Sequence, residues 1–120
     1  MPHRILLADD HEGIRRRVRS ALENAGLDVC GEAVNGQEAV SQAKELLPDL
    51  IVLNLSMPVM NGLEALFQIT QSVPTAKVLI FTMDEGDELR REAFRRGAHG
   101  FASKSNALSD LVDEVEKLLK

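Results

Sequence analysis

Five polar side chains, widely spaced in the sequence, have the chemistry to handle a phosphoryl group with the help of a divalent cation. The adjacent carboxylates of Asp9 and Asp10 and the amide of Asn54 offer the hard oxygen ligands that Mg²⁺ prefers. The hydroxyl of Thr82 and the ammonium of Lys104 are donors suited to phosphate oxygens. Taken singly, these residues have simpler interpretations, such as a solvated acidic pair or a surface lysine. Their meaning therefore depends on whether the fold brings them together.

Each of these residues lies at or just beyond the end of a short apolar run. Such runs alternate with amphipathic stretches, which is the pattern of strands buried on both faces between helices. The expected strands are 4–8, 28–34, 50–53, 77–81 and 98–102. The expected helices are 14–25, 35–47, 63–69 with Phe67 on its apolar face, 89–94 with Phe94 in its stripe, and 108–119. The acidic segment 84–87 before the fourth helix is expected to be mobile.

Alternating strands and helices with short connections predict a parallel sheet with right-handed crossovers. The expected fold is α/β: a flavodoxin-like, doubly wound (βα)5 three-layer sandwich with strand order 2-1-3-4-5 and the fifth strand at an edge. Ligands of such sheets bind at the carboxyl ends of the strands, where the first and third strands flank the switch point. Asp9, Asp10 and Asn54 should therefore meet in one crevice.

Composition limits the classes of function. The 120 residues suit one domain, 1–120, and 14 Lys and Arg against 19 Asp and Glu give a net charge of −5. That charge and the absence of Trp and Tyr argue against direct nucleic-acid binding. No apolar run has membrane-spanning length, and the lone Cys30 excludes an internal disulfide framework. A cytoplasmic protein without a membrane partner is expected.

The arginines at 15–17 and 19 lie on the first amphipathic helix. A cluster of this kind can bind phosphate, but beside Ile14 and Val18 it is more simply interpreted as a solvated helix face.

Over nearly its whole length, the sequence resembles the receiver (CheY-like) domain of bacterial two-component response regulators. The motifs that carry the resemblance are Leu7-Ala8-Asp9-Asp10-His11, Pro48-Asp49-Leu50-Ile51-Val52-Leu53-Asn54, Met57-Pro58 with Asn61-Gly62, Thr82, and Gly97-Ala98 through Gly100-Phe101 to Lys104. Two further motifs, Gly31-Glu32-Ala33 with Asn35-Gly36 and Gly62-Leu63-Glu64-Ala65, resemble the subgroup with a LuxR-type helix-turn-helix output domain.

The resemblance implies a magnesium site. Asp9 and Asp10 would hold Mg²⁺ together with the side chain at position 54 and the backbone carbonyl of Ser56. Asn54 occupies the phosphoacceptor position.

The resemblance also implies a switch. Lys104 would pair with the phosphoryl group, Thr82 would hydrogen-bond it, and Phe101 would turn inward behind Thr82, although core packing alone also explains Phe101. A histidine kinase would supply the phosphoryl group. The face of the fourth helix, fifth strand and fifth helix would contact partners or a second copy of the chain.

Asn54 departs from the family pattern, in which the acceptor is an aspartate. A carboxylate has an anionic oxygen that can attack phosphorus, whereas an amide oxygen is neutral and its lone pair is delocalised. Asn54 should not become phosphorylated, the chain should not act as an enzyme, and Mg²⁺ binding should be weakened by the lost charge.

Two accounts of Asn54 compete. It is either an engineered change that traps the unphosphorylated state or a residue of a natural pseudo-receiver that acts by protein interaction alone. The presence of every other site residue favours the engineered change. A third hypothesis is a Mg²⁺-dependent phosphatase or phosphotransferase with Asp9 as nucleophile, but Asp9-Asp10-His11 lacks the usual pair of acidic residues two apart.

Overall fold

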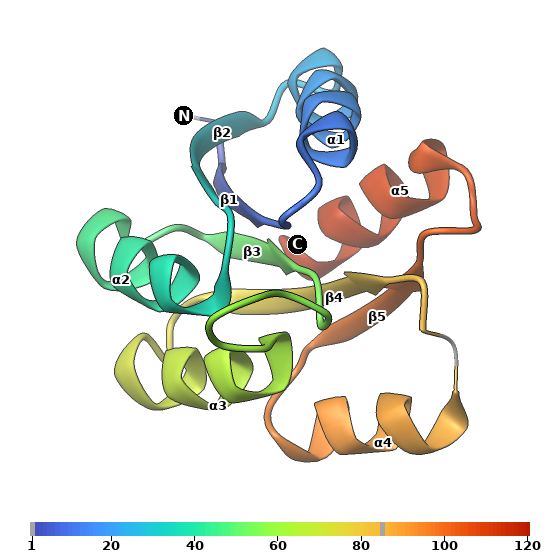
Figure 1. The fold of residues 1–120 in the computed structure, drawn as a ribbon. Helices are drawn as coiled ribbons and strands as arrows, with labels where there is room; N and C mark the ends of the chain where they lie inside the picture. The colour runs from blue at the N-terminus through green and yellow to red at the C-terminus, as the bar shows by residue number, and fades with distance from the viewer. Residues whose placement is uncertain (1, 85) are drawn as a thin grey trace.

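A computed structural model describes residues 2–84 and 86–120. Strands and helices alternate along this part of the chain (Figure 1). The strands are β1 Arg4–Ala8, β2 Asp28–Ala33, β3 Leu50–Leu53, β4 Lys77–Thr82 and β5 Gly100–Ser103. The helices are α1 Glu12–Asn24, α2 Gly36–Leu46, α3 Gly62–Ser72, α4 Asp87–Arg95 and α5 Leu108–Leu118. Residue 85, within the segment expected to be mobile, lies outside the described residues.

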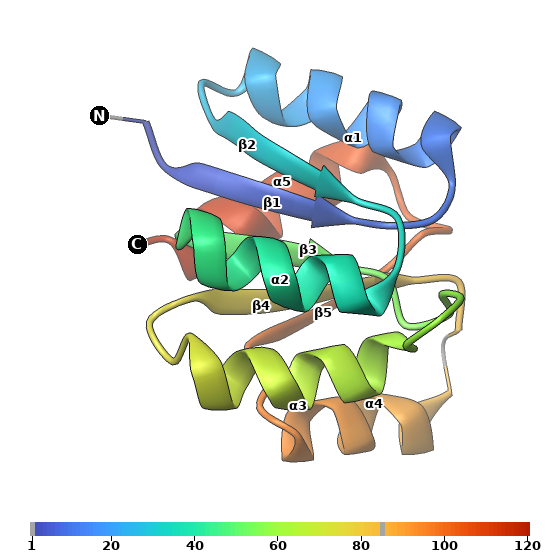
Figure 2. The ribbon, with the colours of Figure 1, turned by 60° about the vertical axis from the view of Figure 1, so that its left-hand side comes forward.

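The strands form one sheet in the order β2-β1-β3-β4-β5, and every neighbouring pair is parallel. The expected fold class and strand order are thereby confirmed, with β5 at an edge. The α2 and α3 helices lie together on one face of the sheet, and α1 and α5 lie on the other (Figures 1 and 2). Each face has its own apolar core, centred on Ile51 and Leu66 on the α2–α3 side and on Leu7 and Leu22 on the other. In the described part of the chain, no helix is long and apolar enough to cross a bilayer.

Local signals fix where α2 and α3 begin. The side chain of Asn35 accepts a hydrogen bond from the Glu38 amide at 2.8 Å, as expected for a helix N-cap. Asn61 caps α3 in the same way through the Glu64 amide at 3.0 Å. These caps place the starts of both helices at the carboxyl edge of the sheet, near the candidate site.

One expectation about side-chain exposure was wrong, and two aromatic side chains of the expected apolar stripes are only partly buried. Phe67 and Phe94 are 47% and 40% exposed, because the narrow apolar stripes of α3 and α4 leave both rings at the margin of the core. In α4, only Ala93 is buried. Arg15 is not part of a solvated face, since its side chain is 13% exposed and paired with Glu32.

The loop between β3 and α3 contains a strained turn. Val59 has φ of 68°, and the Met60 amide donates a hydrogen bond to the Pro58 carbonyl at 2.7 Å. This is a γ-turn of the rare positive-φ type, which is unfavourable for a β-branched residue. The strain therefore lies in the loop that carries Ser56.

Candidate functional site

Backbone hydrogen bonds at the carboxyl edge of the sheet join the end of β1 to β3 and to β2. The Asn54 amide N–H donates to the Ala8 carbonyl at 2.9 Å, and the Asp9 N–H donates to the Ala33 carbonyl at 3.0 Å. Asp9 and Asn54 are 5% and 3% exposed. Parallel pairing thus places these two polar residues side by side and largely out of water, as the strand order predicts.

Lys104 reaches this edge from the loop after β5. Its Nζ lies 2.6 Å from Asp9 Oδ2, and both side chains are buried. The same ammonium lies 5.9 Å from the centre of the Phe81 ring, a cation–π distance. Residues 95 positions apart in the sequence therefore form a buried ion pair at the heart of the site.

The Asn54 side chain points toward the other oxygen groups of the site. Its Nδ2 donates a hydrogen bond to the Ser56 carbonyl at 2.8 Å and a longer one to Asp10 Oδ1 at 3.4 Å. Both acceptors belong to the ligand set that the resemblance implies for Mg²⁺. The amide N–H group thus satisfies oxygens that a cation would otherwise attract.

His11 is a further member of the site that the sequence analysis did not assign. Its Nδ1 lies 3.1 Å from Asp9 Oδ1 and 3.3 Å from Asp10 Oδ1, and its backbone N–H donates to Asp9 Oδ1 at 3.0 Å. The potential ligand atoms of Asp9, Asp10 and His11 all lie within 4.8 Å of one another. The two carboxylates supply the hard oxygen donors that fit Mg²⁺, with room for water on the exposed side. The position of His11 directly after the acidic pair was the available signal.

Thr82 and Phe101 lie beside this cluster on β4 and β5. Thr82 is 1% exposed, its Oγ1 accepts from the Asp84 amide at 3.3 Å, and its carbonyl accepts from the Lys104 amide at 2.9 Å. Phe101 pairs in register with Ile80 and is half-buried against the core on the α2–α3 side. Direct contacts thus join Lys104 to Asp9 and Asn54 to both Asp10 and Ser56, and His11 contacts both members of the acidic pair. Thr82 is connected to Lys104 through the backbone, and Phe101 packs against the core.

A polar network behind Asp9 holds α1 against β2. Arg15 Nη1 donates to the Asp9 carbonyl at 2.6 Å, and its Nε donates to Glu32 at 2.9 Å. Arg19 also bonds Glu32. Although burial raises the pKa of Glu32, the hydrogen bonds from Arg15 and Arg19 lower it below its usual value overall. The network keeps the acidic pair fixed at the start of α1.

Two glycines permit the close packing of this edge. A Cβ on Gly62 would lie 2.2 Å from the Asn54 carbonyl oxygen, and one on Gly36 would lie 2.1 Å from the Met60 carbonyl oxygen. The sequence indicated Asn61-Gly62 as a turn but gave no sign that α3 begins against the Asn54 backbone. Gly62 is therefore a positioning residue for the site.

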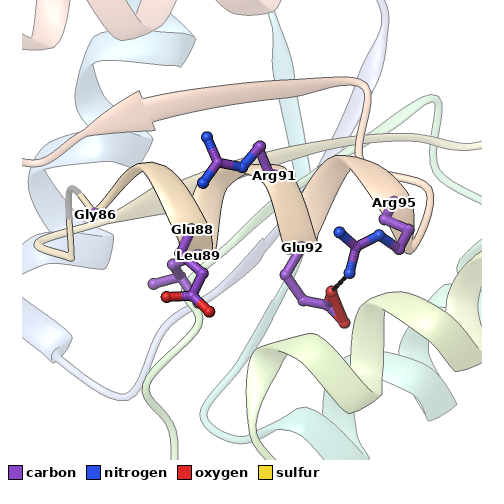
Figure 3. A pocket seen from close by; sticks show the side chains of 6 residues that line it. All are labelled: Gly86, Glu88, Leu89, Arg91, Glu92 and Arg95. Carbon is purple, nitrogen blue, oxygen red and sulfur yellow. Dashed lines mark hydrogen bonds and ion pairs between the residues drawn. The ribbon is translucent and has the colours of Figure 1, made fainter.

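A groove of about 640 Å³ lies elsewhere, along α4. Figure 3 shows that its six labelled residues come from α4 and from Gly86 just before it, with Glu92 ion-paired to Arg95. None of the residues in the acidic cluster lines it. The acidic cluster and this groove along α4 are thus at different places in the molecule.

Comparison with known proteins agrees with this arrangement. Residues 5–116 match the response regulator receiver domain family. The chain is 35% identical to the chemotaxis protein CheY of Thermotoga maritima over 120 residues, the full length of both. It is 36% identical to the response regulator protein VraR of Staphylococcus aureus over 118 residues, which are 98% of this chain and 56% of VraR.

A solved structure of a LuxR-family two-component response regulator from Aurantimonas sp. SI85-9A1 is similar throughout. It superimposes with a TM-score of 0.94 at 37% identity, over 99% of this chain and 86% of that one. Membership of one family explains the ordered motifs, the strand order and the cluster of polar residues at the carboxyl edge of the sheet. The chain belongs to the response regulator receiver domain family.

Proposed function

We propose that residues 1–120 form one receiver domain that controls a partner or output domain through protein contacts, and that Asn54 arrests its phosphorylation. The observation that carries this proposal is the Asn54 amide, which lies at the acceptor position and donates to Asp10 and the Ser56 carbonyl. A neutral amide oxygen lacks the nucleophilic charge of a carboxylate. The domain is therefore a binding module in its present form.

With an aspartate at position 54, the same residues suit acyl phosphate chemistry. The carboxylate oxygen would attack phosphorus of a kinase phosphohistidine, forming the O–P bond as the N–P bond breaks and the imidazole leaves. Mg²⁺ held by Asp9, Asp10 and the Ser56 carbonyl would supply neutralisation of the phosphoryl charge.

The remaining residues would act on the product. The Lys104 ammonium, already buried at this edge, would pair with a phosphoryl oxygen. The Thr82 hydroxyl would exchange its backbone contact for a hydrogen bond to the phosphoryl group, and Phe101 would turn inward behind it. Such a change alters the surface of α4, β5 and α5, which is the proposed face for partners and for a second copy of the chain.

The proposed partners follow from the family. A histidine kinase would donate the phosphoryl group in the cytoplasm, and a helix-turn-helix output domain would follow in a full-length regulator. The chain spans 56% of VraR and 51% of the transcriptional regulatory protein LnrK of Bacillus subtilis. Any contact with DNA would be made by such an output domain, because this chain carries a net charge of −5.

The test is incubation of the chain with acetyl phosphate and Mg²⁺, followed by mass measurement of the intact protein. Asn54→Asp should gain one phosphoryl group, whereas the unaltered chain and Asn54→Ala should gain none. Phosphate on the unaltered chain would refute the arrest. Failure of Asn54→Asp to accept it would refute the receiver chemistry.

The contacts of Asn54 and Asp9 bear on the two alternative functions. The satisfied hydrogen bonds of Asn54 are compatible with a natural pseudo-receiver, and the sequence of the native gene at this codon separates that account from an engineered change. A phosphatase with Asp9 as nucleophile is disfavoured, because Lys104 binds Oδ2 of Asp9 and His11 contacts Oδ1. Turnover of small phosphate esters that is lost in Asp9→Ala would reverse this preference.

A further inference from the structure

Arg90 lies over two aromatic rings that belong to different elements. Its guanidinium carbon is 5.7 Å from the centre of the Phe94 ring, one turn further along α4, and 5.5 Å from the centre of the Phe101 ring on β5. Both distances are within the range of cation–π attraction. The contact to Phe101 crosses from a helix to the edge strand of the sheet.

This contact is important because α4 is weakly anchored. Ala93 is its buried residue, Leu89 is partly buried against the core, and its other large apolar side chain, Phe94, is 40% exposed. Glu92 is occupied with Arg95 in the same helix and with Arg96 at the C-cap, so these ion pairs do not tie α4 to the sheet. The Arg90–Phe101 contact therefore adds a direct side-chain tie between α4 and β5 to the core packing of Leu89 and Ala93.

We propose that Arg90 is a positioning residue that holds the Phe101 ring in its present position and couples any movement of that ring to α4. A ring that turns inward leaves the guanidinium, so the contact favours the unmodified state. Once the contact is broken, α4 loses one of its ties to the sheet. The proposal rests on the inward turn of Phe101 described under the proposed function.

The first test uses the unmodified protein and its amide hydrogen exchange, measured by NMR at residues 91–95. Arg90→Gln keeps a planar polar side chain but loses the charge, and Arg91→Gln is its matched control with the same change in net charge. Arg90→Gln should speed exchange about two- to fivefold, because exposed cation–π contacts have this magnitude. Arg90→Lys, which keeps the charge, should restore most of the protection. Unchanged rates in Arg90→Gln, or an equal change in Arg91→Gln, would overturn the proposal.

A spectroscopic signature separates the contact from a general structural role. Side-chain protons of Arg90 lying over a ring face should resonate upfield, and Phe101→Leu should remove part of that shift while Phe94→Leu removes the rest. An Arg90 spectrum unaffected by Phe101→Leu would contradict the coupling to β5.

The second test concerns the switch and uses Asn54→Asp with Mg²⁺ and beryllofluoride as the phosphoryl analogue. Adding Arg90→Gln should tighten apparent binding about two- to fivefold, since the ring no longer has to leave a cation. Equal affinity with and without Arg90→Gln would show that Arg90 does not oppose the turn. If Asn54→Asp fails to bind the analogue at all, the proposed function fails, while hydrogen exchange still decides whether Arg90 attaches α4.

Discussion

Lys104 Nζ lies 2.6 Å from Asp9 Oδ2, so the buried ammonium is neutralised by a carboxylate of the acidic pair. With a neutral amide at position 54, Asp9 becomes the anionic partner of the lysine. This ion pair ties the loop after β5 to the end of β1. It therefore has consequences for stability that are independent of any phosphorylation.

Lys104→Met should lower the free energy of unfolding by about 3 kcal/mol, because removing one partner leaves a buried charge uncompensated. Urea unfolding followed by far-ultraviolet circular dichroism is the suitable measurement, since the chain has no Trp or Tyr. Lys117→Met is the control, as the Lys117 side chain is 73% exposed and its pair with Glu114 should contribute little. Equal losses in the two variants would show that the Lys104 pair is not specially stabilising.

Asn54→Asp should make the protein less stable without metal and dependent on Mg²⁺. An aspartate cannot donate to Asp10 Oδ1 and the Ser56 carbonyl, which accept from the Asn54 amide, and it adds a like charge beside Asp10. We expect a loss of about 1–3 kcal/mol in EDTA. Mg²⁺ at a hundredfold excess over its dissociation constant should return about 2.7 kcal/mol.

Asn54→Ala separates these two effects, because it removes the donor without adding charge. It should be destabilised, but its melting temperature should respond to Mg²⁺ no more than that of the unaltered chain. A similar Mg²⁺ response in all three proteins would mean that residue 54 does not control cation binding.

Val59→Asn should stabilise the protein by about 1 kcal/mol, because asparagine tolerates the positive φ at which a β-branched residue is strained. Val59 is 77% exposed, so little apolar burial is lost. Val34→Asn is the control, since Val34 is also part-exposed but does not have positive φ. Thermal unfolding in which Val59→Asn melts no higher than the unaltered chain would show that the γ-turn is unstrained.

Sequence patterns were sufficient for the architecture because each buried strand appears as a continuous apolar run, as in Leu50–Leu53. They also located the carboxyl-edge cluster, because a polar residue that directly follows a parallel strand lies at the carboxyl edge of the sheet. They could not show the directions of side chains: that Lys104 pairs with Asp9, that the Asn54 amide turns to Ser56, or that Arg90 covers Phe101. These depend on contacts between residues far apart in the chain, which no local period encodes.

His99 should make stability fall as the pH decreases below about 6.5, the usual imidazole pKa. Burial, together with the nearby charge of Lys77, lowers the pKa of His99. Its Nδ1 is 3.0 Å from the Val78 backbone N–H and accepts its hydrogen bond only when unprotonated. The folded-state pKa lies below the unfolded value, so this stabilisation is complete above the unfolded pKa and is lost as the pH falls through the folded one.

The measurement is the free energy of unfolding between about pH 5 and pH 8, above the range in which carboxylates titrate. His99→Asn keeps an acceptor for Val78 without a titrating ring and should flatten the profile. His3→Asn, at an exposed position before β1, should not. A profile that keeps its slope in His99→Asn would assign the pH dependence to another group.

Gly62→Ala and Gly13→Ala make the same chemical change in two helices and should have opposite effects. A Cβ on Gly62 would lie 2.2 Å from the Asn54 carbonyl oxygen and 2.5 Å from the Leu55 Cα, both rigid backbone atoms, whereas one on Gly13 would meet nothing within 4 Å. Gly62→Ala should therefore lower the free energy of unfolding by at least about 2 kcal/mol, while Gly13→Ala in α1 should raise it by about 0.5–1 kcal/mol through helix propensity.

Because Gly62 packs on the backbone of residue 54, Gly62→Ala should also slow phosphoryl acceptance by the Asn54→Asp variant, whereas Gly13→Ala should leave it unchanged. The measurements are urea unfolding of both variants and acetyl phosphate labelling of each in the Asn54→Asp background. Normal stability and normal labelling of the Gly62→Ala protein would show that Gly62 does not position the site.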